Sequence, residues 1–340
     1  MSFSNWPDCQ HLKQATEDVR GLSFRGPRGP SDAETMSRLS HLSWKADDVE
    51  WMVPPEDLRP RLEEGTDREH GSDIVFAEMD GAAIGYAELR WEASDSDQKY
   101  YRLDVHLLPQ WRGKGIREAM FRSCEERLAE ISSFSRSPAR KYILVWAFDG
   151  QNEWRDILLS AGYLSSWHLL EMVRVDLGAV KDVPAPPGLD LRPARPEDYP
   201  GIWSLFRECF AGEQWSSEAQ WDEQEFEEWK RSKNFMPALW KIARQGEDVV
   251  GVVENYVDED ECRAHGKKVG HSHRVCVRED WRRKGLATYL ITHSLNLFRD
   301  MGMDEVTLDT EVENKSRAMR VYMGVGFTVR RTFTFFVKPL

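Results

Sequence analysis

The sequence is poor in cysteine and in long apolar runs, and each shortage argues against a class of protein. Its five cysteines among 340 residues are odd in number, scattered, and never spaced as Cys-x-x-Cys. This usage favours free thiols in a reducing cytosol over a disulfide framework. No apolar run approaches the ~18–20 residues that cross a bilayer, and residues 1–20 contain no apolar signal core. We therefore expect a cytoplasmic protein without a membrane partner.

An excess of basic charge is also missing. Lysine and arginine number 46 against 58 acidic residues, which gives a net charge of −12. Binding to nucleic acid needs a basic face, so we expect no nucleic-acid partner. The basic residues that do cluster lie in two short segments, 112–117 and 281–284. An acidic body with two basic turns favours an anionic cofactor and a cationic amine substrate.

The most specific pattern lies in the last third of the chain. Residues 274–277 are typical of a strand, 282–287 of a basic turn, and 288–301 of a helix. Such a turn presents backbone N–H groups and a helix N-terminus to an anion, as in a pyrophosphate site. Asn314, Ala318 and Tyr322 follow at four-residue spacing, on one helical face, and precede Gly326.

This ordered combination resembles the GNAT superfamily of acyl-CoA-dependent N-acyltransferases. The family pattern Arg-x-x-Gly-x-Gly/Ala is matched at Arg282, Gly285 and Ala287. The resemblance implies acetyl-CoA as co-substrate and direct attack by a primary amine of a small molecule, which takes the acetyl group. It also implies that the pyrophosphate lies on the amides of the turn and the pantetheine arm alongside residues 275–277.

The same signature occurs twice. Residues 111–116 (WRGKGI) repeat 170 positions later as residues 281–286 (WRRKGL), and three further residue pairs keep offsets of 164–167 in the same order. A shared order at nearly constant spacing indicates a duplicated unit. The tandem architecture is similar to that of mycothiol synthase.

The repeat predicts the domain organisation. We expect an N-terminal extension at 1–20, a first GNAT-like domain at 21–177, a linker rich in proline and glycine at 178–189, and a second, catalytic GNAT domain at 190–340. The predicted class is α/β, with a mixed, mostly antiparallel sheet flanked by helices in each domain. In the second half we expect strands at 190–195, 238–244, 249–257, 270–277, 305–310 and a closing pair within 327–338. Helices are expected at 196–211, 217–231, 283–301 and 314–323.

The resemblance assigns cofactor contacts to residues of both copies. In the second copy they are Val275, Cys276, Val277, Arg282, Arg283, Lys284, Gly285, Leu286, Ala287, Thr288, Asn314 and Arg317. In the first copy they are Leu107, Arg112, Gly113, Lys114, Gly115 and Ile116.

Two residues are expected to carry the chemistry. The resemblance gives Tyr322 the role of donating a proton to the departing thiolate. Glu254 ends an otherwise apolar strand, where desolvation would raise the pKa of a carboxylate toward the working range of a general base. Comparable tandem enzymes use a strand glutamate in a similar place. Glu213, Asp309 and Glu311 are the alternative bases.

The first copy departs from the family pattern at two positions. Arg117 stands where the pattern has a small residue, so its stem either crowds the phosphate or points away. Leu158 stands where the second copy has Tyr322, and leucine cannot donate a proton. We expect the first domain to be catalytically silent, whether or not it binds CoA.

Other readings of the sequence stay open. The chain could be a non-catalytic CoA-binding module, an acyltransferase of peptide or protein amines, or an enzyme that uses another activated acyl donor. His271 and His273 share a strand face, which makes one of them a candidate substrate contact; their spacing with Cys262 and His265 fits a metal site poorly, and we predict none. The acidic run 258–261 is expected to be a solvated hairpin tip. At most two or three of the following tryptophans are expected to contact substrate: Trp203, Trp215, Trp221, Trp229 and Trp240.

Overall fold

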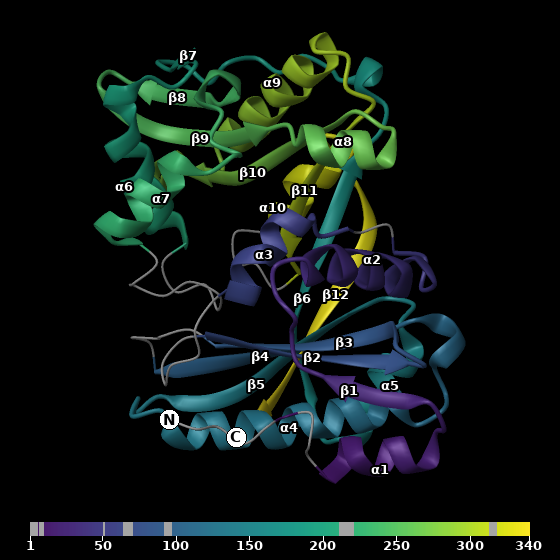
Figure 1. Cartoon of the computed structure of the whole chain (residues 1–340). Helices are drawn as coiled ribbons and strands as arrows, with labels where there is room; N and C mark the ends of the chain where they lie inside the picture. The colour runs from purple at the N-terminus through teal and green to yellow at the C-terminus, as the bar shows by residue number, and fades with distance from the viewer. Residues whose placement is uncertain are drawn as a thin grey trace. The chain divides into compact units, whose positions relative to one another are not determined.

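The computed structural model describes residue 6 and residues 10–49, 52–63, 71–91, 97–210, 221–312 and 318–340 (Figure 1). The chain forms two compact units. The first unit comprises Met1–Ser166 and Thr334–Leu340, and the second comprises Trp167–Phe333. The domain boundaries drawn above from the sequence repeat stay a prediction. None of the helices within the described residues is long and apolar enough to cross a membrane.

The first unit consists of a sheet flanked by helices. Its strands follow the order β1-β2-β3-β4-β5-β12, and only β4 and β5 are parallel among the pairs described here. Its elements are α1 (Gln10–Asp18), β1 (Leu22–Arg25), α2 (Asp32–Lys45), α3 (Pro55–Glu63), β2 (Gly71–Met79), β3 (Ala82–Trp91), β4 (Gln98–Leu107), α4 (Ile116–Phe134), β5 (Arg140–Phe148) and α5 (Asn152–Ser160).

The second unit repeats this plan. Its strand order is β12-β6-β11-β10-β9-β8-β7, with β10 and β11 parallel. Its elements are β6 (Leu164–Arg174), β7 (Asp190–Arg192), α6 (Tyr199–Phe210), α7 (Glu223–Arg231), β8 (Lys241–Gln245), β9 (Asp248–Tyr256), α8 (Glu259–His265), β10 (Val269–Val277), α9 (Leu286–Asp300), β11 (Glu305–Glu311), α10 (Ala318–Gly324) and β12 (Thr328–Pro339). The predicted α/β class with mixed, mostly antiparallel sheets is confirmed.

Three strand predictions were wrong. The strand expected at 238–244 begins only at Lys241, because Pro237–Leu239 form a 3-10 turn. The first strand of the second half ends at Arg192 rather than at residue 195, because Pro193 removes a backbone donor. The predicted closing pair of strands is the single strand β12, since residues 328–338 contain no turn residue that could break them. Residues 334–340 of this last segment belong to the first unit, where Phe336 is part of the hydrophobic core.

The acidic run at 258–261 is not a hairpin tip. Asp258 is the N-cap of α8, and its carboxylate accepts hydrogen bonds from the backbone N–H groups of Asp260 and Glu261. The other three acidic residues form the first turn of that helix, where the helix dipole stabilises negative charge. The run therefore has the sequence pattern of a capped, acidic helix start.

Helices cover both faces of the second unit's sheet. Neighbouring strand residues point to opposite faces, so Ile242 packs with the core of α6 and α7, whereas Ala243 packs with the core of α9. Val252 and Val253 divide in the same way on β9. Glu254, the next residue, therefore lies on the face covered by α6 and α7.

Candidate active site

The two parallel strands β10 and β11 separate partway along their length. Their pairing runs from Val269↔Glu305 to His271↔Thr307 and stops there, although β10 continues to Val277 and β11 to Glu311. We call the unpaired part, residues 272–277 and 308–311, the β10–β11 opening. Backbone donors and acceptors that face such an opening need other partners. An extended ligand with amide groups can supply them.

β10 has a bulge beside this opening. Its pairing with β9 shifts register between His273 and Cys276, and Arg274 has a φ of 38°, which is rare for a residue with a side chain. Beyond the bulge, the N–H of Arg278 donates to β9. Because backbone groups alternate in direction, those of Val277 face the opening.

The turn after β10 has the form of an anion site. Gly285 is the N-cap of α9, with φ 82° and no side-chain cap, so the first N–H groups of the helix lack an intrahelical acceptor. Arg283 also has a positive φ, 61°. The first unit has the same backbone at the equivalent positions, with φ 68° at Gly113 and 77° at Gly115. The repeated sequence signature thus corresponds to a repeated conformation.

Cationic side chains surround this turn. Residues 282–285 are exposed, and Arg282 donates through Nε to the carbonyl of Val277 at 3.1 Å. The Lys284 ammonium lies 4.9 Å from the centre of the Trp281 ring. Free helix amides with a guanidinium and an ammonium beside them suit a pyrophosphate. Two further predicted contacts, Asn314 and Arg317, lie outside the described residues.

Tyr322 lies buried on α10, with its ring 6.2 Å from that of Phe327. Burial raises the pKa of its phenol, and the Cys276 thiol on β10 adds to the shift. The hydroxyl therefore keeps its proton at neutral pH. A protonated phenol beside β10 is chemically able to act as a general acid.

A pocket of about 390 Å³ opens on the α6/α7 face of the sheet. Its lining is aromatic and acidic around one imidazole: Trp203, Trp221, Glu225, Glu228, Trp229, Ser232, Asn234, Glu254, Tyr256, His273 and Arg274. Three of the five tryptophans singled out above line it. Trp240 is fully buried and stacks on Trp229, while Trp215 lies outside the described residues, as does Glu213.

Glu254 is 4% exposed and holds three donors. Trp229 donates to one oxygen at 2.7 Å, while His273 and Arg274 approach the other at 3.3 and 3.4 Å. Burial alone would raise the pKa of this carboxylate. The hydrogen bond with His273, the positive charge of Arg274 and the Trp229 donor outweigh it, so the pKa lies below the ordinary value. The expected rise of the Glu254 pKa was therefore wrong.

Glu254 begins a row of titratable side chains across four strands. It lies directly opposite His273 on β10, and Asp309 on β11 lies directly opposite Glu171 on β6. Extending the β10–β11 register by two residues aligns His273 with Asp309, so all four side chains share one face. Although Asp309 is exposed, desolvation and the neighbouring Glu171 charge raise its pKa to about 6. Among the described residues that line the pocket, neither Asp309 nor Glu311 is included.

The first unit lacks several of these features. Its β4 pairs with β3 without a register shift from Leu107 to Tyr101. Leu158 is fully buried at the position equivalent to Tyr322. The Arg112 guanidinium is bound to both oxygens of Asp47 and to Ser43, whereas the equivalent Arg282 is exposed.

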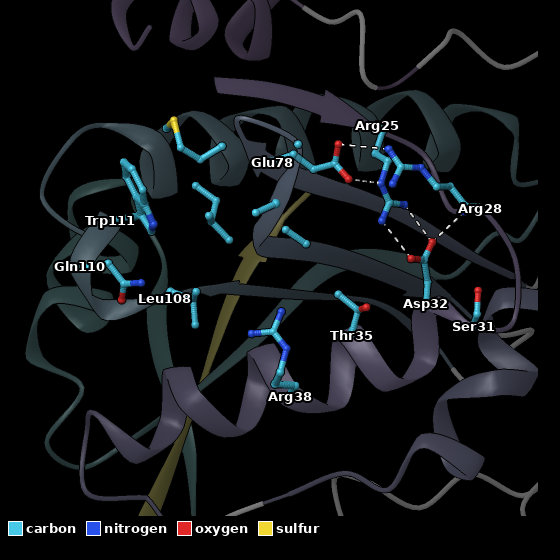
Figure 2. A pocket seen from close by; sticks show the side chains of 15 residues that line it. Arg25, Arg28, Ser31, Asp32, Thr35, Arg38, Glu78, Leu108, Gln110 and Trp111 are labelled. Atoms are coloured by element: carbon cyan, nitrogen blue, oxygen red, sulfur yellow. Dashed lines mark hydrogen bonds and ion pairs between the residues drawn. The ribbon is translucent and has the colours of Figure 1, made fainter. Parts of the chain in front are cut away.

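The first unit contains a larger cavity of about 760 Å³ in a different place (Figure 2). Arg25 binds Asp32 with two hydrogen bonds and Glu78 with a third, and Arg28 contacts both carboxylates. These charges cancel one another, and they tie β1 to α2 and β2. Arg192 and Asp198 form the same bidentate pair in the second unit, which indicates a repeated structural link.

Comparison with known proteins identifies the family. The profile of the acetyltransferase (GNAT) family matches residues 36–137 and 199–327, which together exceed half of the chain. The chain belongs to this family. The resemblance inferred from the two turns is thus confirmed, as is the presence of two GNAT regions in tandem. It is an N-acetyltransferase family, and its members generally use acetyl-CoA.

Solved GNAT structures share the fold. A GCN5-related N-acetyltransferase from Sphaerobacter thermophilus has a TM-score of 0.71 and 22% identity, covering 94% of this chain and 96% of that one. A tandem GNAT protein from the clavulanic acid biosynthesis pathway has a TM-score of 0.63 and 14% identity, covering 94% and 98%. N-alpha-acetyltransferase 30 of Xenopus laevis is 32% identical over 105 residues, which are 30% of this chain and 36% of that protein. The chain thus spans about a third of that relative.

The Asp309 pKa leads to a pH-dependent stability prediction. It is about 6 in the folded protein and returns to ~3.9 on unfolding. Between these values, rising pH charges the unfolded chain first, so stability falls as pH increases. Asp309→Asn removes this loss and should raise the melting temperature at pH 8 but not at pH 3. Solvent screening makes the gain smaller than the pKa difference implies.

The control is Asp156→Asn, which changes an exposed helix carboxylate. Its melting temperature should follow wild type at both pH values. Equal melting temperatures of wild type and Asp309→Asn at pH 8 would show that folding does not raise the pKa of Asp309.

Proposed function

We propose that the second unit transfers an acetyl group from acetyl-CoA to the primary amine of a small, cationic molecule. The observation that supports this most directly is the combination, in one unit, of the β10–β11 opening, the anion turn and a pocket with acidic and aromatic walls. The first two suit the cofactor, and the third suits the acceptor. In the first unit, the buried Leu158 stands at the position equivalent to Tyr322, and leucine cannot act as an acid.

The residues that would hold acetyl-CoA fit its chemistry. The first amides of α9, with Arg282 and Lys284, suit the pyrophosphate, and the backbone N–H of Val277 suits a carbonyl of the pantetheine arm. The remaining cofactor contacts named above for the second copy belong to this proposal. Bound acetyl-CoA supplies an acetyl thioester, whose acyl group is activated toward amines.

His273 is our candidate for the group that takes the amine proton. Half of its side chain is exposed, at 51%, and its Nδ1 lies 3.3 Å from Glu254. A carboxylate on one ring nitrogen orients the imidazole, which leaves the other nitrogen free to accept a proton. Glu254 is then a positioning residue, because its own charge is held by three donors and makes it a weak base.

Tyr322 is the proposed general acid. Its raised pKa keeps the phenol protonated at neutral pH, so the hydroxyl can donate a hydrogen bond and then a proton to the sulfur as negative charge develops there. A proton from the hydroxyl would neutralise the sulfur as it leaves.

The lining of the pocket indicates a cationic acceptor. Glu225 and Glu228 add negative charge at its wall, and aromatic side chains such as Trp203 and Trp221 are typical partners of an alkylammonium group. A peptide N-terminus is the second candidate, supported by the likeness to N-alpha-acetyltransferase 30 over 105 residues. Acetyl-CoA turnover with matched panels of polyamines, amino sugars and short peptides distinguishes the two. Turnover of peptides alone would reject the small-molecule acceptor.

The cofactor turn can be tested with one glycine. Gly285→Asp adds a side chain at φ 82° and a negative charge beside the expected pyrophosphate, and should weaken acetyl-CoA binding by about tenfold or more. Titration calorimetry measures the affinity. Gly115→Asp is the matched control, because it makes the same change at φ 77° in the first unit and should leave binding and turnover intact. Unchanged affinity in folded Gly285→Asp would mean that the cofactor lies elsewhere.

Tyr322→Phe tests the general acid. Only a hydroxyl is lost, so acetyl-CoA affinity should persist, while kcat should fall by roughly 100-fold or more. Rapid-quench measurement of the acetyl-transfer step isolates the chemistry from product release. Tyr289→Phe, at another buried tyrosine of the same unit, should leave kcat unchanged. A wild-type rate in Tyr322→Phe would remove this residue from the mechanism.

His273→Ala and Glu254→Gln separate the base from its partner. A base must be deprotonated, so wild-type kcat/KM should rise with pH along an acidic limb. We expect His273→Ala to lose that limb and about 100-fold in rate. Glu254→Gln should keep the limb and lower the rate by less than His273→Ala does, because the imidazole stays in place but loses the carboxylate that orients it. Loss of the limb in Glu254→Gln, with the limb retained in His273→Ala, would instead make Glu254 the base.

A further inference from the structure

The first unit has an opening like that of the second. Its parallel strands β4 and β5 pair from Gln98↔Arg140 to Arg102↔Leu144, and then both continue without pairing. We call residues 103–107 and 145–148 the β4–β5 opening. Although β4 lacks the bulge of β10, this opening also has backbone groups at its edges that could face an acyl-CoA arm.

Hydrogen bonds on the sides of β4 and β5 that face away from the opening show which backbone groups face it. The N–H of Leu108 donates to β3, so the alternating backbone places the carbonyl of Val105 toward β5. On the other strand, the carbonyl of Lys141 accepts from Leu340, so the carbonyl of Trp146 points toward β4. Val105 and Trp146 therefore present acceptors to the opening from opposite sides.

Two side chains of the first unit already bind these acceptors. Arg117, in the first turn of α4, donates to the carbonyl of Val105 at 3.4 Å, and Trp154, on α5, donates to that of Trp146 at 3.2 Å. The guanidinium carbon of Arg117 lies 4.4 Å from the centre of the Trp154 ring. The two form one stack across the opening.

The stack is part of the interior of the unit. Arg117 is 3% exposed and Trp154 4%. Burial, followed by the charge of Arg112, lowers the pKa of Arg117 to about 10, which leaves it charged at neutral pH. Glu153 gives it a partner at 3.5 Å. Of the two outcomes expected for Arg117, crowding the phosphate or pointing away, it points inward.

The second unit has alanine at both positions. Ala287 is equivalent to Arg117 by the offset of the two turns, and Ala318 is equivalent to Trp154 by the offset of the two Gly-aromatic pairs. A methyl group at each place leaves the β10–β11 opening free of such a stack. The contrast between the units thus lies in two side chains rather than in the backbone of the turn.

We propose that the Arg117–Trp154 stack closes the β4–β5 opening, so that the first unit binds no acyl-CoA and each chain holds a single one. This deepens the proposed function, because it assumes that the second unit is the cofactor site. It withdraws the predicted cofactor contacts of the first copy, from Leu107 to Ile116; among them, Arg112 is bound instead to Asp47 and Ser43.

The test is the binding stoichiometry of acetyl-CoA on the full chain, by calorimetry and native mass spectrometry. Wild type should bind one molecule, and Arg117→Ala/Trp154→Ala should bind a second. Acetyl transfer at the second unit should stay at the wild-type rate. Arg155→Ala/Leu159→Ala is the matched control on exposed or partly exposed positions of α5, and it should keep one site.

Two molecules bound to wild type would overturn the proposal, as would a single site in the folded double variant. If the double variant does not fold, Gly285→Asp provides the test, because it leaves only the first unit able to bind. Absence of binding to this folded variant is expected, and binding would refute the closure. Failure of wild type to bind any acetyl-CoA would reject the proposed function instead.

Discussion

The parting of two parallel strands is the constraint on which the site depends. Where β10 and β11 stop pairing after His271↔Thr307, their edge groups lose the partners that a continuous sheet would give them. Either a ligand or another part of the protein must satisfy them. The second unit leaves its opening clear of bulky side chains at the two equivalent positions, whereas the first fills it with Arg117 and Trp154. Two copies of one fold, of which only the second has the bulge, therefore have different openings.

The same strands organise the acid–base chemistry. The bulge in β10 lies between His273 and Cys276, so one strand presents an imidazole to the pocket and backbone groups to the opening. Glu254 is inserted among donors from α7 and β10, which keeps its charge in a buried place. A buried carboxylate with three donors is better suited to fix its neighbours than to exchange protons. The position of Glu254 at the end of an apolar strand does not reveal these three donors.

The sequence predicted the fold well because its signals were local or repeated. The turn residues around Gly285 and the spacing to Tyr322 depend on short-range geometry. The same turn pattern at residues 111–116 gave independent support for this interpretation. Contacts between distant segments could not be predicted: Trp229 lies 25 residues before Glu254, and no periodicity links them. For the same reason Arg117 was recognised as a departure from the pattern, but its inward direction depended on Trp154, which only the fold brings beside it.

The shared last strand has a consequence for synthesis. The first unit needs residues 334–340, whose Phe336 is 1% exposed within its core. A ribosome making the chain from its N-terminus produces Met1–Ser166 long before that strand exists. During translation of the whole second unit, the nascent first unit therefore carries an incomplete core and an unpaired β5 edge, which exposes it to mispairing and makes it a natural client of chaperones.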